Sequence, residues 1–206
     1  MFKPILLNTP MTKATLDNRK TQTRRLNGLS KINEDPNRWN FDSLSIDGDD
    51  LIAWFENKIT YEQVGIKSPY GAPGTILWVR ETFYYVDGYP NKELYGYKAD
   101  HDEEFIKNAH KVGIFTPSIH MPREAARLFL KVKSIRVERS QDITEKDALL
   151  EGLKNGWEPR MNGGYITAMS NFKDLWNSTI KKSDIDTYGW NANPFVWVIE
   201  FERVSE

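Results

Sequence analysis

The chain has 206 residues, which suits one large domain or a small domain with insertions and is long enough to bury a core. Its formal net charge of −1 argues against a wholly basic nucleic-acid coat, so any nucleic-acid site must be a local patch. Cysteine is absent, which excludes disulfides and thiolate sites and fits a reducing cytoplasm. No apolar run approaches the ~20 residues of a membrane-spanning helix, and the first residues do not resemble a signal peptide.

The first elements are predicted to be a strand, a helix and an extended segment. Residues 4–8 are expected to form a short buried strand. Thr9, followed by proline, is predicted to cap a helix that ends near Asn18. The segment 18–25 then places four cations within eight residues. Alternation over 20–24 predicts that the chain leaves the helix in an extended conformation.

Two regions are predicted to be insertions. Residues 26–67 show no clean period and are expected to form an insertion or lid with some structure of its own. Within them, the Asp-Gly-Asp-Asp sequence at 47–50 lacks the later bidentate glutamate of a calcium loop, so it predicts a turn. Residues 156–164 are expected to form a second, loop-like insertion.

Strands dominate the remaining chain, with short helices between them. Strands are predicted at 75–81, 84–89, 94–99, 127–139 and 195–201. Helices are predicted at 100–110, 144–152 and 166–180. Thr144 and Asp147 form a variant capping box, and a change of register near Ser134 indicates a bulge. The pattern favours one α+β domain over residues 1–206, a mixed β-barrel with peripheral helices.

Metal and cofactor chemistry find little support in the sequence. The histidines, His101, His110 and His120, have no paired spacing and no Glu-x-x-His partner, so no metal site is expected. No phosphate-binding glycine loop follows a strand, and no cofactor is expected. Ser118 and His120 could contribute to a Ser-His-Asp triad, but residues two apart on a strand share a face by pleating alone.

Lys20 and Thr23 form a stronger candidate site. Residues three apart at a helix-to-strand junction can both turn toward one cavity. A lysine beside a hydroxyl and a carboxylate can supply a base, a proton donor and an oxyanion contact for amide hydrolysis. Spacing leaves that carboxylate open between Glu81 and Glu151. An exposed cationic segment would instead be a solvated turn, or would bind phosphate.

Four parts of the chain, in order and spanning nearly its whole length, carry a resemblance to a known family. They are Lys3-Pro-Ile-Leu-Leu-Asn-Thr9 with Asn18-Arg-Lys-Thr-Gln-Thr-Arg-Arg25, Gly74-Thr-Ile-Leu-Trp-Val-Arg-Glu81, Ser118-Ile-His-Met-Pro-Arg123 and Asn193-Pro-Phe-Val-Trp-Val-Ile-Glu-Phe201. Together they resemble the ASCH-domain proteins, a branch of the PUA-like β-barrels, and in particular those carried by bacteriophages and prophages. The resemblance implies a PUA-like barrel that recognises RNA or nucleosides in the cytoplasm of a bacterial host cell.

The resemblance also implies roles for individual residues. One small bacterial branch of the superfamily hydrolyses N4-acetylcytidine to cytidine and acetate with a lysine, a threonine and a glutamate. Its Arg-Lys-Thr-x-Thr motif is matched here at Lys20 and Thr23. Its glutamate follows a Leu-Thr-Glu-Lys helix start, which is similar to residues 143–146 and selects Glu151. Lys20 would then be the nucleophile or base, Thr23 would assist it, and Glu151 would handle the proton.

Other readings stay open beside the hydrolase, because that branch is much shorter and this chain has a further polar set that could line the cavity. The set consists of Arg80, Glu81, Ser118, His120 and Arg123. A few ASCH proteins are implied to cut single-stranded RNA, a role that Lys20, Arg24 and Ser118 could serve. An RNA-binding groove would draw on Arg19, Arg24, Arg25, Arg80 and Arg123. A hydrolase would stack a base on Trp78 or Tyr84.

A third reading is a phage accessory or morphogenesis protein without catalysis. Its aromatic side chains would then serve the core and partner contacts. The hydrolase and RNA readings share one expectation, a nucleotide-recognising cavity beside Lys20, with single-stranded RNA or a modified nucleoside as the ligand.

Overall fold

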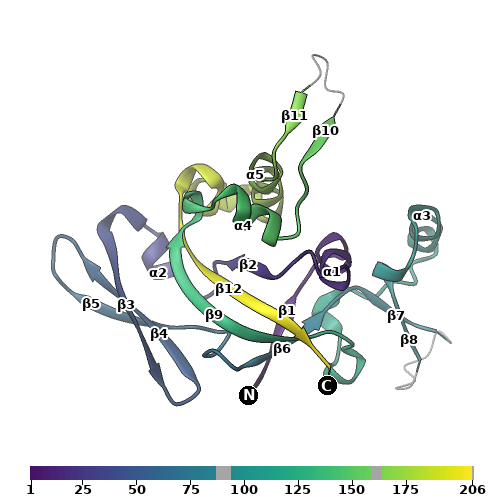
Figure 1. The fold of residues 1–206 in the computed structure, drawn as a ribbon, viewed down its shortest axis with the longest axis horizontal. Coiled ribbons are helices and arrows are strands. Elements are labelled where there is room, and N and C mark those ends of the chain that lie inside the picture. The colour runs from purple at the N-terminus through teal and green to yellow at the C-terminus, as the bar shows by residue number, and fades with distance from the viewer. Residues whose placement is uncertain (87–93, 159–163, 206) are drawn as a thin grey trace.

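A five-stranded sheet, here called the central sheet, lies in the middle of the computed structural model, which describes residues 1–86, 94–158 and 164–205. The order of its strands is β1 (Phe2–Leu6), β6 (Ile76–Arg80), β9 (Phe129–Arg139), β12 (Phe195–Val204) and β2 (Gln22–Arg25). β1 and β6 are parallel, and the other neighbouring pairs are antiparallel. Segments from both ends and the middle of the chain therefore build one sheet (Figure 1).

The central sheet curls strongly, but strand pairing does not close it. The register of β9 and β12 shifts after Glu200, which faces Ser134, so the predicted bulge is confirmed. A bulge bends its strand and increases the local twist, and β9 and β12 curve visibly in Figure 1. Among the described residues the edge strands β1 and β2 share no ladder; Nη2 of Arg25 donates instead to the carbonyl oxygen of Leu6 at 2.7 Å. The predicted α+β class is confirmed, whereas the sheet is open and not a closed barrel.

Strand β12 is buried on both faces, which explains its nearly continuous apolar sequence. Alternate residues enter two different cores because successive side chains point to opposite faces. Phe195, Trp197, Ile199 and Phe201 join the larger core inside the curl. Val196 and Val198 join a second core with Phe172, Trp176 and other residues of the helical layer.

The helical layer contains α4 (Glu145–Leu150), α5 (Ala168–Thr179) and α6 (Ile185–Tyr188), whereas α1 (Thr9–Leu16) joins β1 to the cationic segment. The predicted capping box of Thr144 and Asp147 is present at the start of α4. The predicted cap of α1 is wrong by one residue. Oδ1 of Asn8 accepts from the backbone N–H of Met11 at 3.0 Å, so Thr9 is already the first helical residue.

Residues 26–67 contribute a structured unit to the fold. After α2 (Ser30–Asn33), strands β3 (Trp39–Asp47), β4 (Asp50–Asn57) and β5 (Gln63–Lys67) form an antiparallel sheet. Phe55 is fully buried in the larger core, with its ring 5.3 Å from that of Phe195 in an edge-to-face contact. The predicted insertion thus has its own sheet and packs beside the central sheet (Figure 1).

Asn33 ties this unit to the central sheet. Its buried amide donates from Nδ2 to the carbonyl oxygen of Phe195 at 2.9 Å and accepts at Oδ1 from the N–H of the same residue at 2.8 Å. We expect Asn33→Ala to lower the free energy of unfolding by about 2–4 kcal/mol, because both backbone groups would be left buried and unpaired. Urea denaturation measures this loss. Asn40→Ala, at an exposed position of β3, should change it by less than about 0.5 kcal/mol; equal losses would contradict the assignment.

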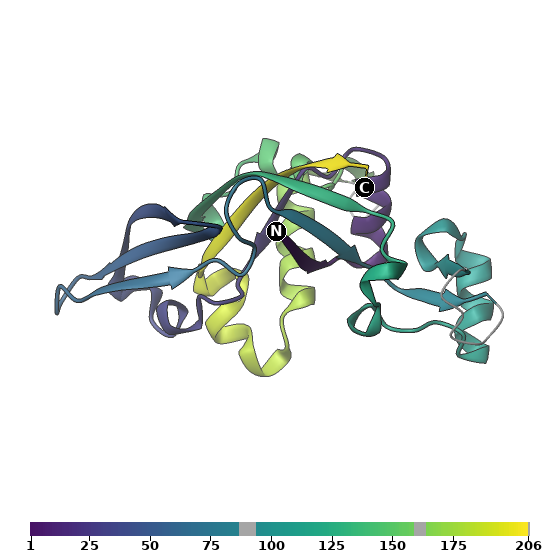
Figure 2. The same cartoon turned by 90° about the horizontal axis from the view of Figure 1, so that it is seen from below.

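The described elements between residues 82 and 127 form a small subdomain at the opposite end of the molecule from β3–β5 (Figure 2). It contains β7 (Phe83–Tyr85), β8 (Tyr95–Tyr97) and α3 (Glu103–Val112). Side chains of β7 and β8 pack with Met121 and Ala125 in a small third core around Phe83. Asp87-Gly88 and Pro90-Asn91 predict turns between the strands expected at 84–89 and 94–99, and both turns lie outside the described residues. The 156–164 insertion includes β10 (Gly156–Glu158) and the start of β11 (Gly164–Ile166), and its residues 159–163 are likewise outside. Across the described ranges, no helix combines the length and apolarity needed to cross a membrane.

Seven short 3-10 helices complete the described elements. They span Pro36–Arg38, Lys98–Asp100, Ser118–His120, Arg123–Ala125, Ser140–Asp142, Lys182–Asp184 and Trp190–Ala192. The sequence at 124–126 predicts a single helical turn, and the fourth of these helices begins one residue earlier.

Candidate functional site

The backbone places Lys20 directly beside Glu151, although 131 residues separate them in sequence. The chain reverses after α1 through Asn18, whose φ is +56°, and Lys20 then forms an isolated antiparallel bridge with Glu151, the residue after α4. Gly152 permits this approach. A Cβ atom there would lie 2.8 Å from the Cβ of Ala14 and 3.0 Å from that of Lys20, and its φ is +93°.

The Lys20 amine is buried and has three hydrogen-bond acceptors. Nζ lies 2.8 Å from Oε2 of Glu151, 3.0 Å from the Glu151 carbonyl oxygen and 2.7 Å from that of Gln22. The residue is only 3 % exposed. Burial lowers the pKa of Lys20 from 10.5, and the neighbouring Arg25 and Arg24 guanidinium groups lower it further, while Glu151 opposes the shift. The amine is therefore easier to deprotonate than that of an exposed lysine.

Arg24 contacts the other oxygen of the Glu151 carboxylate. Its Nη1 donates to Oε1 of Glu151 at 3.2 Å, so Glu151 bridges Lys20 and Arg24. The Arg24 side chain is fully buried and also pairs with Glu138 through Nε and Nη2, and with Asp147 at 3.5 Å. Its guanidinium carbon lies 5.7 Å from the centre of the Phe172 ring. These contacts hold Glu151 from the side opposite Lys20.

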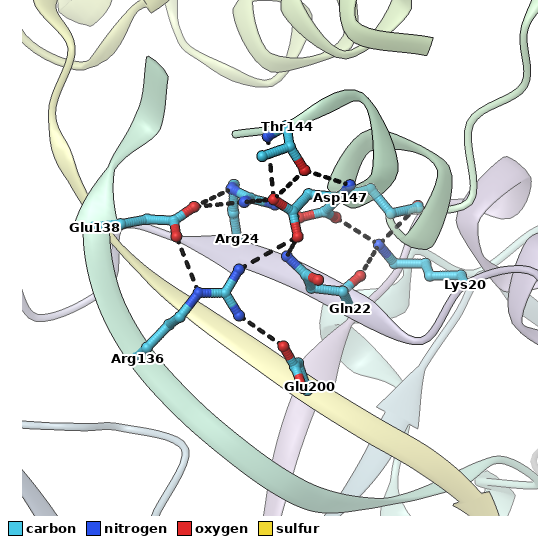
Figure 3. Close-up of polar contacts among 9 residues, drawn as sticks. Lys20, Gln22, Arg24, Arg136, Glu138, Thr144, Asp147 and Glu200 are labelled. Carbon is cyan, nitrogen blue, oxygen red and sulfur yellow. Dashed lines mark hydrogen bonds and ion pairs between the residues drawn. The ribbon is translucent and has the colours of Figure 1, made fainter. Parts of the chain in front are cut away.

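Further charged groups extend this buried network, as Figure 3 shows. Arg136 contacts Glu138 at 3.0 Å, Glu200 at 2.7 Å and Asp147 at 3.3 Å. Burial raises the pKa of Asp147, but hydrogen bonds from Thr144 and Gln22, with the nearby Arg24, lower it more, and the net shift is downward. The network anchors β2 to β9, β12 and the start of α4.

A cavity of about 220 Å³ opens beside this network and is here called the Lys20 cavity. Its polar wall includes Lys20, Thr23, Arg24, Arg25 and Glu151. Its apolar wall comes mainly from α5, through Phe172, Leu175 and Trp176, and from Met11 of α1. In the described part of the chain, the Thr23 hydroxyl has no hydrogen-bond partner, although the residue is 98 % shielded.

The structure brings four of the predicted site residues together and separates them from Glu81. Lys20, Thr23, Arg24 and Glu151 line one cavity. Glu81 is buried elsewhere, where its oxygens accept from Nε and Nη2 of Arg127 at 2.9 and 3.1 Å. Burial raises the pKa of Glu81, against the opposing effect of that arginine. Of the two carboxylates left open by spacing, Glu151 is the one beside Lys20.

The remaining predicted residues lie outside the Lys20 cavity. Arg19 donates to Asp17 at 2.9 Å and to the carbonyl oxygen of Gly152 at 2.8 Å. Arg80 lines a neighbouring cavity, and Arg123 lies over the Phe2 ring, 3.8 Å from its centre. Ser118 and His120 lie in one 3-10 turn, where no described hydrogen bond joins their side chains. The polar set that could have lined the cavity beside Lys20 is therefore absent from its described lining.

Two further expectations about the site change with the structure. Neither Trp78 nor Tyr84 lines the Lys20 cavity; Tyr84 instead contacts His101, with its hydroxyl oxygen 3.0 Å from Nε2. The aromatic wall is Phe172 and Trp176 of α5, which also belong to the second core. The 26–67 region does not form a lid over this cavity, since none of its described strands contributes to the lining.

The sequence reasoning also missed the carboxylates that hold Arg24. Glu138 and Arg136 lie two apart in β9, so they share the polar face of a strand whose other face carries Ile135 and Val137. A polar face on an alternating strand is usually solvated, so local spacing gave no signal of a buried network there. Asp147 had been identified only as a helix cap.

The site has no assembly suited to a metal ion among the described residues, where no cluster of three or more histidine, cysteine, aspartate or glutamate side chains occurs. Its chemistry is that of an amine, a carboxylate, a hydroxyl and two guanidinium groups around a small, partly aromatic cavity. A scan of protein-family models and searches of curated proteins and of solved structures found no match to this chain.

Proposed function

We propose that this chain is an ASCH-domain protein of the PUA-like superfamily that hydrolyses the acyl amide of an N4-acylated, cytidine-type nucleoside. The observation that carries the proposal is the buried contact of 2.8 Å between Nζ of Lys20 and Oε2 of Glu151 at the wall of a small cavity. Thr23, which the resemblance makes the assistant of Lys20, lines the same cavity. The carboxylate selected by the resemblance is thus also the one that the tertiary structure places beside the lysine.

The curled central sheet supports membership in the PUA-like superfamily. Its edges β1 and β2 are linked by the hydrogen bond from Arg25 to Leu6, and the Lys20 cavity includes residues of both edges. Helices α4 and α5 cover one face of the sheet, which agrees with the expected peripheral helices. The arrangement is a barrel-like sheet with a cavity at its open seam.

The size and lining of the cavity favour a small ligand. At about 220 Å³ it is smaller than the 300–1,000 Å³ typical of sites for drug-sized molecules, so it suits a single base or nucleoside. Phe172 and Trp176 offer aromatic surface against which a planar base can pack. The polar wall opposite them can then contact the exocyclic amide.

Lys20, Thr23 and Glu151 can each perform a different step of the hydrolysis. Lys20 must first lose a proton, which its burial favours, and its neutral amine can then take a proton from water. The hydroxide formed adds to the acyl carbon, and the Thr23 hydroxyl can donate to the oxyanion that develops. When the carbon–nitrogen bond breaks, the proton passes through Lys20 and Glu151 to the departing nitrogen. The products are a free exocyclic amine and a carboxylic acid.

An RNA-binding or RNA-cleaving role is the second candidate, and the pairing of the cations weighs against it. Arg24 is neutralised by buried carboxylates, and Arg19 by Asp17. A groove that holds an RNA backbone needs cations that are available to phosphates. Of the proposed set, Arg25 and Arg80 remain without a carboxylate partner in the described contacts. Two such cations suit one phosphate group better than a backbone. A non-catalytic accessory role would leave the buried Lys20–Glu151 pair without a function beyond stability.

The pH dependence of N4-acetylcytidine hydrolysis tests the proposal. We expect purified protein to release cytidine and acetate, with kcat/KM rising with pH to a plateau whose midpoint lies below 10.5, since the neutral amine is the active form and the pKa of Lys20 is lowered. Product formation is followed by chromatography across the pH range. Lys133→Ala, at an exposed lysine of β9, should leave the profile unchanged. Absence of turnover at every pH would refute the proposed function.

The lowered pKa of Lys20 also makes the stability of the fold depend on pH. Because the pKa of Lys20 is lower in the folded chain, the unfolded chain binds more protons between the folded pKa and 10.5. The free energy of unfolding of the wild type should therefore rise with pH through that window, relative to Lys20→Met, which cannot titrate. Urea denaturation of both proteins at several pH values provides a readout of Lys20 that does not depend on activity.

A further inference from the structure

A second cavity, here called the Arg80 cavity, adjoins the Lys20 cavity at the seam of the central sheet. It measures about 350 Å³ and shares Leu6 and Arg25 with the first cavity. The remaining wall comes from β1, from the segment around Tyr70 and from Arg80 of β6. The two cavities therefore meet where Arg25 reaches across from β2 to β1.

Arg25 faces both cavities. Its Nη2 donates to the carbonyl oxygen of Leu6 at 2.7 Å, and the described contacts leave its other N–H groups without a partner. The positive charge of Arg25 acts on groups in both places, since it contributes to the lowered pKa of Lys20 on one side and opposes the rise that burial causes in the pKa of Tyr70 on the other. One guanidinium can thus contact a ligand that extends from the first cavity into the second.

Arg80 supplies a second cation to the Arg80 cavity. Its Cα pairs with that of Leu6 across the parallel strands β1 and β6, which places it beside the carbonyl group that Arg25 contacts. Nη2 of Arg80 donates to the carbonyl oxygen of Ile119, whereas its Nε is buried and has no hydrogen-bond partner among the described residues. Nη1 of Arg80 likewise has no hydrogen-bond partner in the described contacts and is not buried, and guanidinium N–H groups donate strongly to anionic acceptors.

Among the residues that the structure describes, the Arg80 cavity has no opposing negative charge, since neither aspartate nor glutamate is part of its lining. Burial raises the pKa of Tyr70 to about 12, so its phenol is neutral at pH 7, and it donates to Oδ1 of Asn27 at 3.1 Å. Two arginines without a carboxylate partner, in a chain with a slight excess of acidic residues, favour a bound anion.

We infer that the ligand of this protein is a nucleotide, whose base enters the Lys20 cavity and whose phosphate group binds between Arg25 and Arg80. This inference rests on the proposed function for the identity of the base, but it concerns a different part of the ligand. Guanidinium groups match the geometry of phosphate oxygens and can each donate two hydrogen bonds. The volumes of the two cavities, about 220 and 350 Å³, favour a mononucleotide over a longer RNA.

Hydrolysis of N4-acetylcytidine and of its 5′-monophosphate by the same protein tests the inference. We expect kcat/KM to be about 10- to 100-fold higher for the monophosphate, as hydrogen bonds to charged groups usually contribute. In Arg80→Gln this ratio should fall toward one, and Arg25→Lys, which removes the second donor pair but keeps the charge, should lower it in part. Arg38→Gln, at an exposed arginine paired with Asp35, should keep the wild-type ratio. A ratio near one in the wild type would overturn the inference while leaving the proposed function intact.

Binding measurements separate the inference from the activity. Calorimetry with cytidine and with cytidine 5′-monophosphate, at two salt concentrations, should show tighter and more salt-dependent binding of the monophosphate. If neither acetylated compound is hydrolysed but this preference is present and lost in Arg80→Gln, the phosphate site stands and the proposed hydrolysis fails. Equal affinities for the two compounds would refute the phosphate site. Tighter binding of a short cytidine-containing RNA than of the mononucleotide would refute the assignment to a mononucleotide.

Discussion

Lys20→Ala is expected to lower kcat/KM for N4-acetylcytidine by a factor of about 10² to 10⁴, the usual contribution of a positioned acid–base group. The physical reason is that Nζ of Lys20 is the amine beside both the Glu151 carboxylate and the cavity. Glu151→Gln should lower the rate as well, because a neutral amide can neither take up the proton nor stabilise a charged Lys20. Steady-state kinetics with purified variants, near the pH of the plateau, measures both effects.

The control for this result must separate chemistry from folding. Removing Lys20 leaves Glu151 buried but still paired with Arg24 at 3.2 Å, so the carboxylate keeps a cationic partner. Circular dichroism and urea denaturation should therefore show a folded Lys20→Ala variant. Lys133→Ala serves as the matched surface substitution, since that lysine side chain is 60 % exposed. Full activity in a folded Lys20→Ala variant would show that Lys20 is not the base.

Arg24→Ala is expected to cause the largest loss of stability, about 3–5 kcal/mol in the free energy of unfolding. The Arg24 side chain is fully buried and is the common partner of Glu138, Asp147 and Glu151. Its removal leaves buried negative charges facing one another without their central cation. Asp147 keeps its bonds from Thr144 and Glu138 keeps Arg136, but Glu151 would depend on Lys20 alone.

Urea denaturation followed by circular dichroism measures this loss, with Arg38→Ala as the matched control. The Arg38–Asp35 pair is exposed, so its removal should cost no more than about 1 kcal/mol. Arg24→Met retains an apolar stem and separates the loss of charge from the loss of packing against Phe172. If Arg24→Ala is no less stable than Arg38→Ala, the network does not stabilise the fold as proposed.

Local signals in the sequence determined most elements. The capping box of Thr144 and Asp147 set the start of α4, because a side chain and a backbone N–H three residues apart interact without help from distant residues. The alternation of β9 and the apolar run of β12 predicted both strands, and the change of period near Ser134 predicted the bulge. The local cap of α1 failed by one residue since Asn8 and Thr9 are both good caps in sequence.

Only the tertiary structure decided which charges meet. Lys20 and Glu151 are neighbours because the chain turns after α1 and because β2 pairs with β12 beneath α4. The two residues are 131 positions apart, so no local spacing in the sequence predicts their contact. Resemblance selected Glu151, but from the residues alone Glu81 was equally suitable until its pairing with Arg127 was seen. The open seam between β1 and β2, which joins the two cavities at Arg25, likewise depends on how far the whole sheet curls. Sequence identified the chemical groups of the site, and long-range packing determined their partners, since partner choice depends on distances in space.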